Sequence, residues 1–303
     1  MALVVGHSQS FEAPVRAMRE LVERGSLGWL RAVNAWYFTD WMYRPRHPDE
    51  LDREQGGGVT MRQAAHHVDI VRLLGGGLLR SVRAMTGVWD PDRRAEGSYT
   101  AYLEFEDGTP ATVFYSGYYH FPSAELTFGS GEAGQPLGDD YAVARRRLRA
   151  VRSPEDERAL KTGAAGGGSS RQLEMLSGGD GQPFFGLVVI SCEHGDVRVS
   201  PDGLLIYDDE ARREVPLTDR RRGREVLLDE LVGAVRSGRP PQHDGRWGLT
   251  NLEVCVAIRD SAQRRREGDL HHQVPLRPAS LAASSRRVVA VAHMKEESTG
   301  GAG

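Results

Sequence analysis

Three side chains with complementary chemistry, Arg62, His66 and Asp69, occupy one predicted helix in the stretch GGGVTMRQAAHHVDIVRLL, which begins at Gly56 and ends at Leu74. Their spacing places them on a narrow stripe of one helical face. The guanidinium can hold a carboxylate, the imidazole can exchange a proton near neutral pH, and the aspartate can orient the ring or support its charged form. The stripe predicts a site for a carboxylated ligand that gains or loses a proton.

The three glycines before this helix favour a tight turn whose backbone amides point outward, and such a helix start attracts anions. The alternative is an ordinary solvated face, because Gln63, His67 and Arg72 are polar as well and most polar stripes on helices are only solvated. The residues alone leave both interpretations open.

A predicted strand at residues 30–39, rich in aromatic and β-branched residues, adds candidate ligand contacts. Tyr37 lies within it, and the polar and aromatic segment DWMYRPRHPDE follows it. That segment contributes Tyr43, Arg44, Arg46 and His47 as further candidates. For the two arginines the alternative is the solvated charge of a loop.

The helices and strands predicted around these residues indicate a layered α+β fold with an antiparallel sheet. Ser10 can cap a helix at 11–24 that ends at Gly25. Glu106, Asp107 and Gly108 form a hairpin signal between two strands. The expected strands span residues 3–6, 79–87, 98–105, 111–116, 184–191, 196–200 and 204–207, and further helices span 141–161, 225–236 and 248–266.

The sequence GSGEAG at 129–134 matches the pattern G-x-G-x-x-G, which binds dinucleotides when a helix begins at its glycines. Here Pro136 and Gly138 follow at once, so we interpret the match as chance.

The amino-acid composition excludes several classes of protein. The chain has 303 residues, 39% hydrophobic and 27% charged, with a formal net charge of −3, so nothing predicts a nucleic-acid partner. Cys192 and Cys255 are too isolated for a disulfide framework or a metal cluster, which favours a reducing compartment. No apolar run reaches the roughly 18 residues of a membrane span, and no signal-peptide pattern is present, so we expect a cytoplasmic protein.

The stretch GGGVTMRQAAHHVD resembles the glycine, histidine and aspartate motif that opens the substrate domain of the glucose-fructose oxidoreductase and inositol dehydrogenase (Gfo/Idh/MocA) family. Within that family, WYFTDWMYRPR, RSVRAMTGVWD and PFFGLVVISCEHGDVRVSPDGLLIYDD look like members of the phthalate 4,5-dihydrodiol dehydrogenase type. The resemblance extends to about Gln273. It implies a large, open, mostly antiparallel sheet with helices on one face.

The resemblance makes His66 the active-site histidine and Asp69 the aspartate that follows it. Arg62 stands where many sugar-oxidising members have an aspartate, and an arginine there favours an aromatic or diol acid over a plain sugar. The implied reaction is hydride transfer between a substrate alcohol carbon and NAD or NADP, with His66 as general acid or base and Arg62 as substrate anchor. Tyr43, Arg44 and Tyr37 are the other expected substrate contacts.

Family members begin with a dinucleotide-binding half that carries a glycine-rich turn and a Glu-Lys-Pro motif, and this chain shows neither at its start. The expected strand at 3–6 resembles the last strand of that half. We therefore expect residues 1–28 to be a remnant of the nucleotide-binding fold and 29–278 to be the substrate and oligomerisation domain. Residues 139–181 form an expected flexible insertion, and 279–303 an expected mobile tail. Alone, such a chain would not bind NAD(P) tightly.

Three hypotheses stay open. The chain is a truncated reading of an NAD(P)-dependent dehydrogenase, or a half that pairs with a separate nucleotide-binding chain. Alternatively, it is a binding module for aromatic acids without catalysis. The third hypothesis is a structural remnant whose exposed sheet face mediates contacts in a homo-oligomer.

Overall fold

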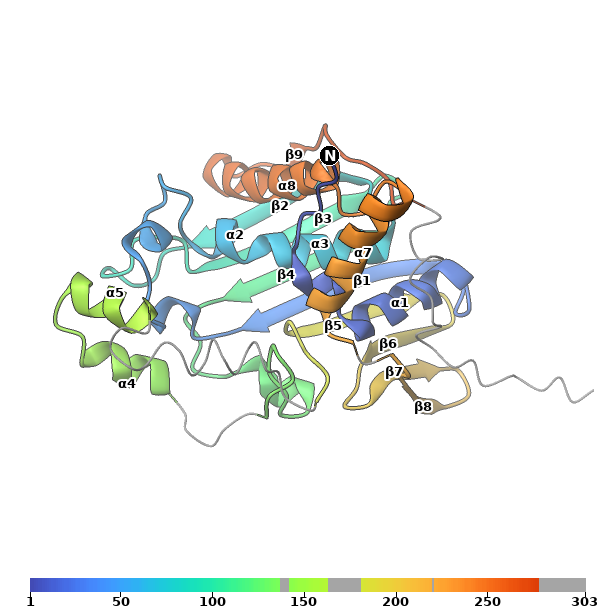
Figure 1. Ribbon diagram of the computed structural model, residues 1–303, viewed down its shortest axis with the longest axis horizontal. Helices are drawn as coiled ribbons and strands as arrows, with labels where there is room; N and C mark the ends of the chain where they lie inside the picture. The colour runs from blue at the N-terminus through green and yellow to red at the C-terminus, as the bar shows by residue number, and fades with distance from the viewer. Residues whose placement is uncertain (137–141, 163–180, 220, 278–303) are drawn as a thin grey trace, which may run out of the picture.

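The computed structural model describes residues 1–136, 142–162, 181–219 and 221–277. Of the flexible insertion expected at 139–181, residues 139–141 and 163–180 lie outside these ranges, as does the tail expected at 279–303. The described residues form a nine-stranded sheet in the order β8-β7-β6-β5-β1-β4-β3-β2-β9 (Figure 1). Strands β1 and β4 are parallel, and every other neighbouring pair is antiparallel. The predicted α+β class with a mostly antiparallel sheet is confirmed.

The strands agree closely with the sequence pattern where apolar and polar residues alternate. The hairpin signal is also confirmed, because the backbone N–H of Phe105 donates to the carbonyl of Thr109 across it. Two further strands at the edges, β8 and β9, were not predicted. The strands are β1 (Leu30–Phe38), β2 (Leu79–Gly87), β3 (Ser98–Phe105), β4 (Pro110–Ser116), β5 (Leu187–Cys192), β6 (Gly195–Val199), β7 (Gly203–Asp208), β8 (Arg212–Pro216) and β9 (Gly268–Asp269).

Four helices contact strands on one face of this sheet, at residues 13–24, 59–62, 64–75 and 245–264, and short 3-10 turns link helices to strands (Figure 1). The α-helices are α1 (Ala13–Arg24), α2 (Val59–Arg62), α3 (Ala64–Gly75), α4 (Val143–Arg149), α5 (Pro154–Thr162), α7 (Gly223–Ser237) and α8 (Gly245–Arg264). The 3-10 turns are η1 (Ser8–Phe11), η2 (Trp41–Tyr43), η3 (Pro48–Leu51) and η4 (Ser123–Thr127). No helix within the described ranges is both long and apolar enough to cross a membrane.

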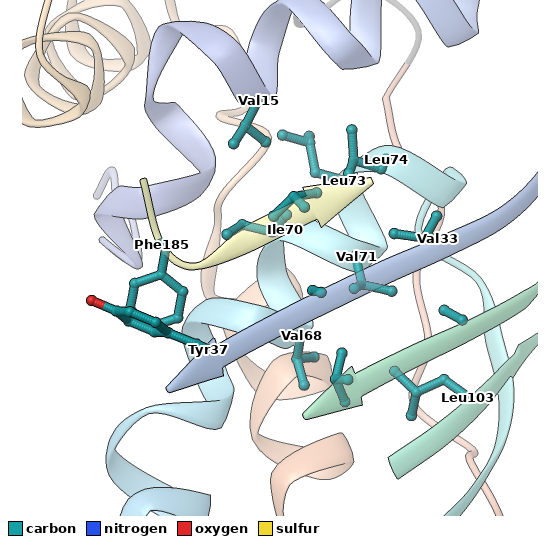
Figure 2. Close-up of a cluster of buried hydrophobic side chains, with 14 of the residues drawn as sticks. Val15, Val33, Tyr37, Val68, Ile70, Val71, Leu73, Leu74, Leu103 and Phe185 are labelled. Carbon is teal, nitrogen blue, oxygen red and sulfur yellow. The ribbon is translucent and has the colours of Figure 1, made fainter. Parts of the chain in front are cut away.

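The central helix α3 is enclosed by the core. Val68, Ile70 and Val71 lie in a buried cluster with side chains of the sheet, among them Val33 of β1 and Leu103 of β3 (Figure 2). Because α8 also packs against α3, the polar residues His67, Asp69 and Arg72 of α3 are buried too. A helix enclosed in this way cannot present a wholly solvated polar face.

Three local expectations are wrong. Residues 3–6 form no strand, because Val5 has a helix and not a strand beside it: its N–H donates to the carbonyl of His243 just before α8. The first helix begins at Ala13, with Glu12 and not Ser10 at the N-cap position. The helix expected at 141–161 is divided into α4 and α5, since Pro154 lacks the N–H that a continuous helix requires.

Candidate functional site

The predicted stripe is interrupted between Arg62 and His66. Gln63 has a φ of −124°, so α2 ends at Arg62 and α3 begins at Ala64. Arg62 is 38% exposed, and it donates from Nη2 to Asp49 Oδ2 at 2.9 Å and from Nε to the carbonyl of Gly56 at 3.1 Å. The structure therefore separates Arg62 from the other two side chains, which corrects the expected three-residue alignment.

The glycine turn is not an anion site. The backbone N–H groups of Gly57, Gly58 and Val59 donate to the carbonyls of Asp52, Glu50 and Glu96, at 2.7, 2.9 and 2.7 Å. These amides are already engaged, so they cannot receive a ligand. The glycines serve the close approach of the turn to its neighbours instead.

Asp69 lies fully buried at the interface of α3 and α8. Its Oδ1 accepts hydrogen bonds from Trp247 Nε1 at 2.5 Å and from Asn251 Nδ2 at 2.7 Å. Burial raises the pKa of Asp69, but His243 and His7 and the hydrogen bonds outweigh it and hold the pKa below its ordinary value. Asp69 is therefore a fixed negative charge at neutral pH.

His66 stands one turn before Asp69 on α3 and is only partly covered. Its ring meets His7 edge-on, with centroids 5.8 Å apart, and Phe185 at 5.1 Å. Burial lowers the pKa of His66, Glu132 and Asp69 raise it, and the net pKa lies below the ordinary value. Nδ1 is buried and has no hydrogen-bond partner among the described residues. Nε2 forms no hydrogen bond within the described ranges either and is not buried in this way, so this neutral imidazole can take a proton there.

The other polar residues of α3 have structural roles. His67 Nδ1 is 2.8 Å from the Tyr99 hydroxyl, and Arg72 donates to the side chain of Asn251 at 2.6 Å and stacks over the ring of Trp247. Both side chains are fully buried. The solvated-face alternative is therefore wrong for α3.

Two of the predicted substrate contacts, Tyr37 and Arg44, lie near Glu132, whose charge also acts on His66. The hydroxyl of Tyr37 donates to Glu132 Oε2 at 3.3 Å, and the Tyr37 ring packs against Phe185, which also covers His66. Arg44 is 19% exposed and donates from Nε to Asp40 Oδ1 at 2.6 Å. Burial lowers the pKa of Arg44, but Asp40, followed by Glu132, raises it above the ordinary value. Arg44 stays a cation, and within the described part of the chain its Nη groups have no hydrogen-bond partner.

The remaining loop candidates lie elsewhere. Arg145 covers the ring of Tyr43 at 3.9 Å, and no described contact joins Tyr43 to His66. Arg46 is buried: it stacks on Trp41 and donates to that residue's carbonyl, so the solvated-charge alternative is wrong for it. His47 closes a turn with Glu50.

Sequence reasoning missed His7, Trp247, Asn251 and His243. They lie far from α3 along the chain, and only the packing of the first residues and of α8 against α3 brings them to Asp69. No local pattern marks them. None of the described histidines, cysteines and carboxylates gather in a group that would hold a metal ion.

The glycine pattern at 129–134 does not fit a dinucleotide. No helix begins there, and the N–H groups of Gly131 and Gly134 donate to the carbonyls of Gln135 and Gly131. A pyrophosphate needs free amides at a helix start, and this turn provides none.

Comparison with known proteins identifies the family. The model of the GFO/IDH/MocA C-terminal domain matches residues 15–135. The chain is 32% identical over 285 residues to 1-carboxy-3-chloro-3,4-dihydroxycyclohexa-1,5-diene dehydrogenase of Comamonas testosteroni, an alignment that covers 94% of this chain and 70% of the relative. The chain belongs to the Gfo/Idh/MocA family of oxidoreductases.

Solved structures support this assignment. A Bordetella bronchiseptica RB50 protein assigned to the dehydrogenases is 38% identical, with a TM-score of 0.79, over 89% of this chain and 70% of that one. Levoglucosan dehydrogenase in complex with NADH and levoglucosan is 13% identical, with a TM-score of 0.60, over 89% of this chain and 66% of that one. The second likeness concerns the fold alone.

Proposed function

We propose that the chain supplies the substrate-binding and proton-transferring half of a dehydrogenase that oxidises an alcohol carbon of a carboxylated cyclic diol. The observation that carries the proposal is the partly covered imidazole of His66, kept neutral by burial, beside the fixed charge of Asp69. The name of the Comamonas relative supports the substrate class, because it describes a ring that carries a carboxylate and two hydroxyls.

His66 is the general base in this proposal. It takes the hydroxyl proton as the carbinol carbon is oxidised and returns it in the reverse direction. Asp69 acts through His66: held by Trp247 and Asn251, it cannot turn away, and its charge stabilises the imidazolium that forms. Removal of this charge is expected to weaken His66 as a base.

Arg44 is the proposed anchor for the substrate carboxylate. Its Nε is held by Asp40, which leaves the Nη side of the guanidinium fork for a ligand. Tyr37 and Phe185 provide aromatic surface between this cation and His66. Arg44 takes the anchoring role that the sequence predicted for Arg62, because the guanidinium of Arg62 already donates to Asp49 and to the carbonyl of Gly56.

The hydride acceptor is proposed to be NAD or NADP. When bound, a nicotinamide would take the hydride that leaves the carbinol carbon. No described segment of this chain offers a pyrophosphate cradle, so we assign nucleotide binding to a separate chain or to a segment outside these 303 residues.

The lack of a nucleotide cradle in the described residues also favours a second candidate, a binding module for carboxylated rings without catalysis. One experiment separates the two. Calorimetry measures binding of a carboxylated cyclic diol, and turnover is assayed with NAD+ or NADP+, with the chain alone and after addition of the segment of the Comamonas relative that the alignment leaves uncovered.

We expect diol binding by the chain alone, and turnover only with the added segment. His66→Asn should abolish turnover and leave affinity within about threefold, whereas Arg44→Ala should weaken binding by about tenfold to a hundredfold, the scale of a charged hydrogen bond. Arg62→Ala is the matched control and should leave affinity unchanged. Binding without turnover in any mixture would favour the module, and absence of binding would reject both candidates.

A further inference from the structure

The side-chain amide of Asn251 has a defined orientation. Arg72 carries only donors, and its Nη1 lies 2.6 Å from Asn251 Oδ1. The oxygen of the amide therefore faces Arg72, and its nitrogen faces the other two neighbours. Nδ2 is 2.7 Å from Asp69 Oδ1 and 3.2 Å from His7 Nδ1, so each of its two protons has an acceptor.

This orientation determines which nitrogen of His7 carries the proton. Since Asn251 donates to Nδ1, that atom must be an acceptor, and the proton of the neutral ring lies on Nε2. The ring is neutral near pH 7, because burial lowers the pKa of His7 more than Asp69 raises it. His7 is thus a neutral imidazole with an N–H donor at Nε2.

That donor lies beside the proposed base. The rings of His7 and His66 meet edge-on, with centroids 5.8 Å apart. No residue in the described ranges forms a hydrogen bond with His7 Nε2, and His7 is only partly covered. The two neighbouring histidines therefore have different roles: His66 is the base, and His7 offers an N–H donor at Nε2.

We propose that His7 is a substrate-binding residue whose Nε2–H holds the second hydroxyl of a vicinal diol while the first hydroxyl transfers its proton to His66. The inference rests on the proposed function and adds the substrate feature that the site selects. A site built to hydrogen-bond a hydroxyl discriminates against an analogue that lacks it, because the buried donor is then left unpaired. The pair of histidines therefore selects diols over simple alcohols.

The first test concerns the tautomer and needs no ligand. Nitrogen NMR of the full chain labelled with 15N-histidine, with the His7 signals assigned from a His7→Gln variant, should show the proton on Nε2. Asn251→Asp replaces the donor by an acceptor and should move the proton to Nδ1. A proton on Nδ1 in the parent chain would overturn the inference.

The second test compares two ligands. Calorimetry on the full chain should show that a carboxylated vicinal diol binds at least about tenfold more tightly than the matching mono-alcohol. His7→Phe should abolish this preference by weakening the diol alone, and His7→Gln, which keeps an N–H donor, should restore part of it. If the parent binds both ligands equally, or His7→Phe keeps the preference, the inference fails and the proposed function stands.

His243→Gln is the matched control. His243 also lies near Asp69, but its ring nitrogens already face Glu230 and Ser10, so it offers no donor to a ligand. This variant disturbs the same cluster and should leave the diol preference unchanged. If the parent binds neither ligand, the proposed function and the inference fail together.

Discussion

His67 makes the stability of the protein depend on pH. Burial, reinforced by His66, lowers the pKa of its ring to about 3, whereas the pKa in the unfolded chain is about 6.5. The unfolded state therefore binds the proton first, and the stability present above the unfolded pKa is lost as pH falls. We expect urea denaturation to show a free energy of unfolding that drops by about 1 kcal/mol per pH unit below pH 6.5.

Two variants attribute this dependence to His67. His67→Gln removes the titrating ring and should flatten the dependence measured between neutral and mildly acidic pH. Tyr99→Phe removes only the hydroxyl that faces His67 Nδ1, so it should lower stability at all pH values and retain the slope. An unchanged slope in His67→Gln would show that other groups dominate.

Residue types predicted part of the candidate site. His66 and Asp69 were identified because they lie one turn apart in a recognisable segment, and in the structure Asp69 raises the pKa of His66 against the larger effect of burial. The prediction that Arg62 lies beside them was wrong, because Gln63 interrupts the helix. The helix propensities of the residues in VTMRQAAHH do not indicate such an interruption. His7 and Asn251 could not be found, since only the tertiary packing of α8 and the first residues on α3 brings them together.

In the glycine turn before α2, one backbone position accepts only glycine. Gly58 has a φ of +87°, and a Cβ there would lie 2.8 Å from Glu96 Oε2 and 2.9 Å from the Glu96 carbonyl. Gly56 has a φ of +75° with no atom near its Cβ position. We expect Gly58→Ala to lower the free energy of unfolding by roughly 3 kcal/mol and Gly56→Ala by roughly 1 kcal/mol. Urea unfolding of both variants measures the difference, and equal losses would mean that Glu96 moves aside.

Secondary structure was predicted well where buried apolar side chains alternate with polar ones along a strand. Strands β2 and β3 were predicted with the bounds observed. In β3 every second side chain, from Tyr99 to Phe105, is apolar and buried, and in β2 Leu79, Val82 and Ala84 are buried. The edge strand β8 was missed, since most of its residues are exposed and charged and carry no such signal. Residues 3–6 are mostly apolar, as in a buried strand, but they lie beside helices and have no strand to pair with. The composition of a segment does not show which elements will lie next to it.

The sheet has two unlike faces across the whole molecule. Ala35, Ala84, Ala101 and Val113 are buried on the face that carries α1, α3 and α8 (Figure 1). The alternate residues form a row across four strands, because Trp36 pairs with Phe114, Phe114 with Thr100, and Thr100 with Met85. Trp36 and Met85 are 44% and 68% exposed. An aromatic and apolar row in register on an open face is typical of a protein interface.

We propose that a second copy of the chain covers this row and forms a homodimer through the sheet face. Trp36→Glu places a charge at the β1 end of the row, where burial without a partner is costly, so it should convert the dimer to a monomer. Sedimentation equilibrium measures the mass, and circular dichroism checks that the variant stays folded. Leu249→Glu is the matched control, because Leu249 is 52% exposed on α8, and it should leave the mass unchanged. A monomeric parent, or a Trp36→Glu variant that remains a dimer, would contradict an interface at this face.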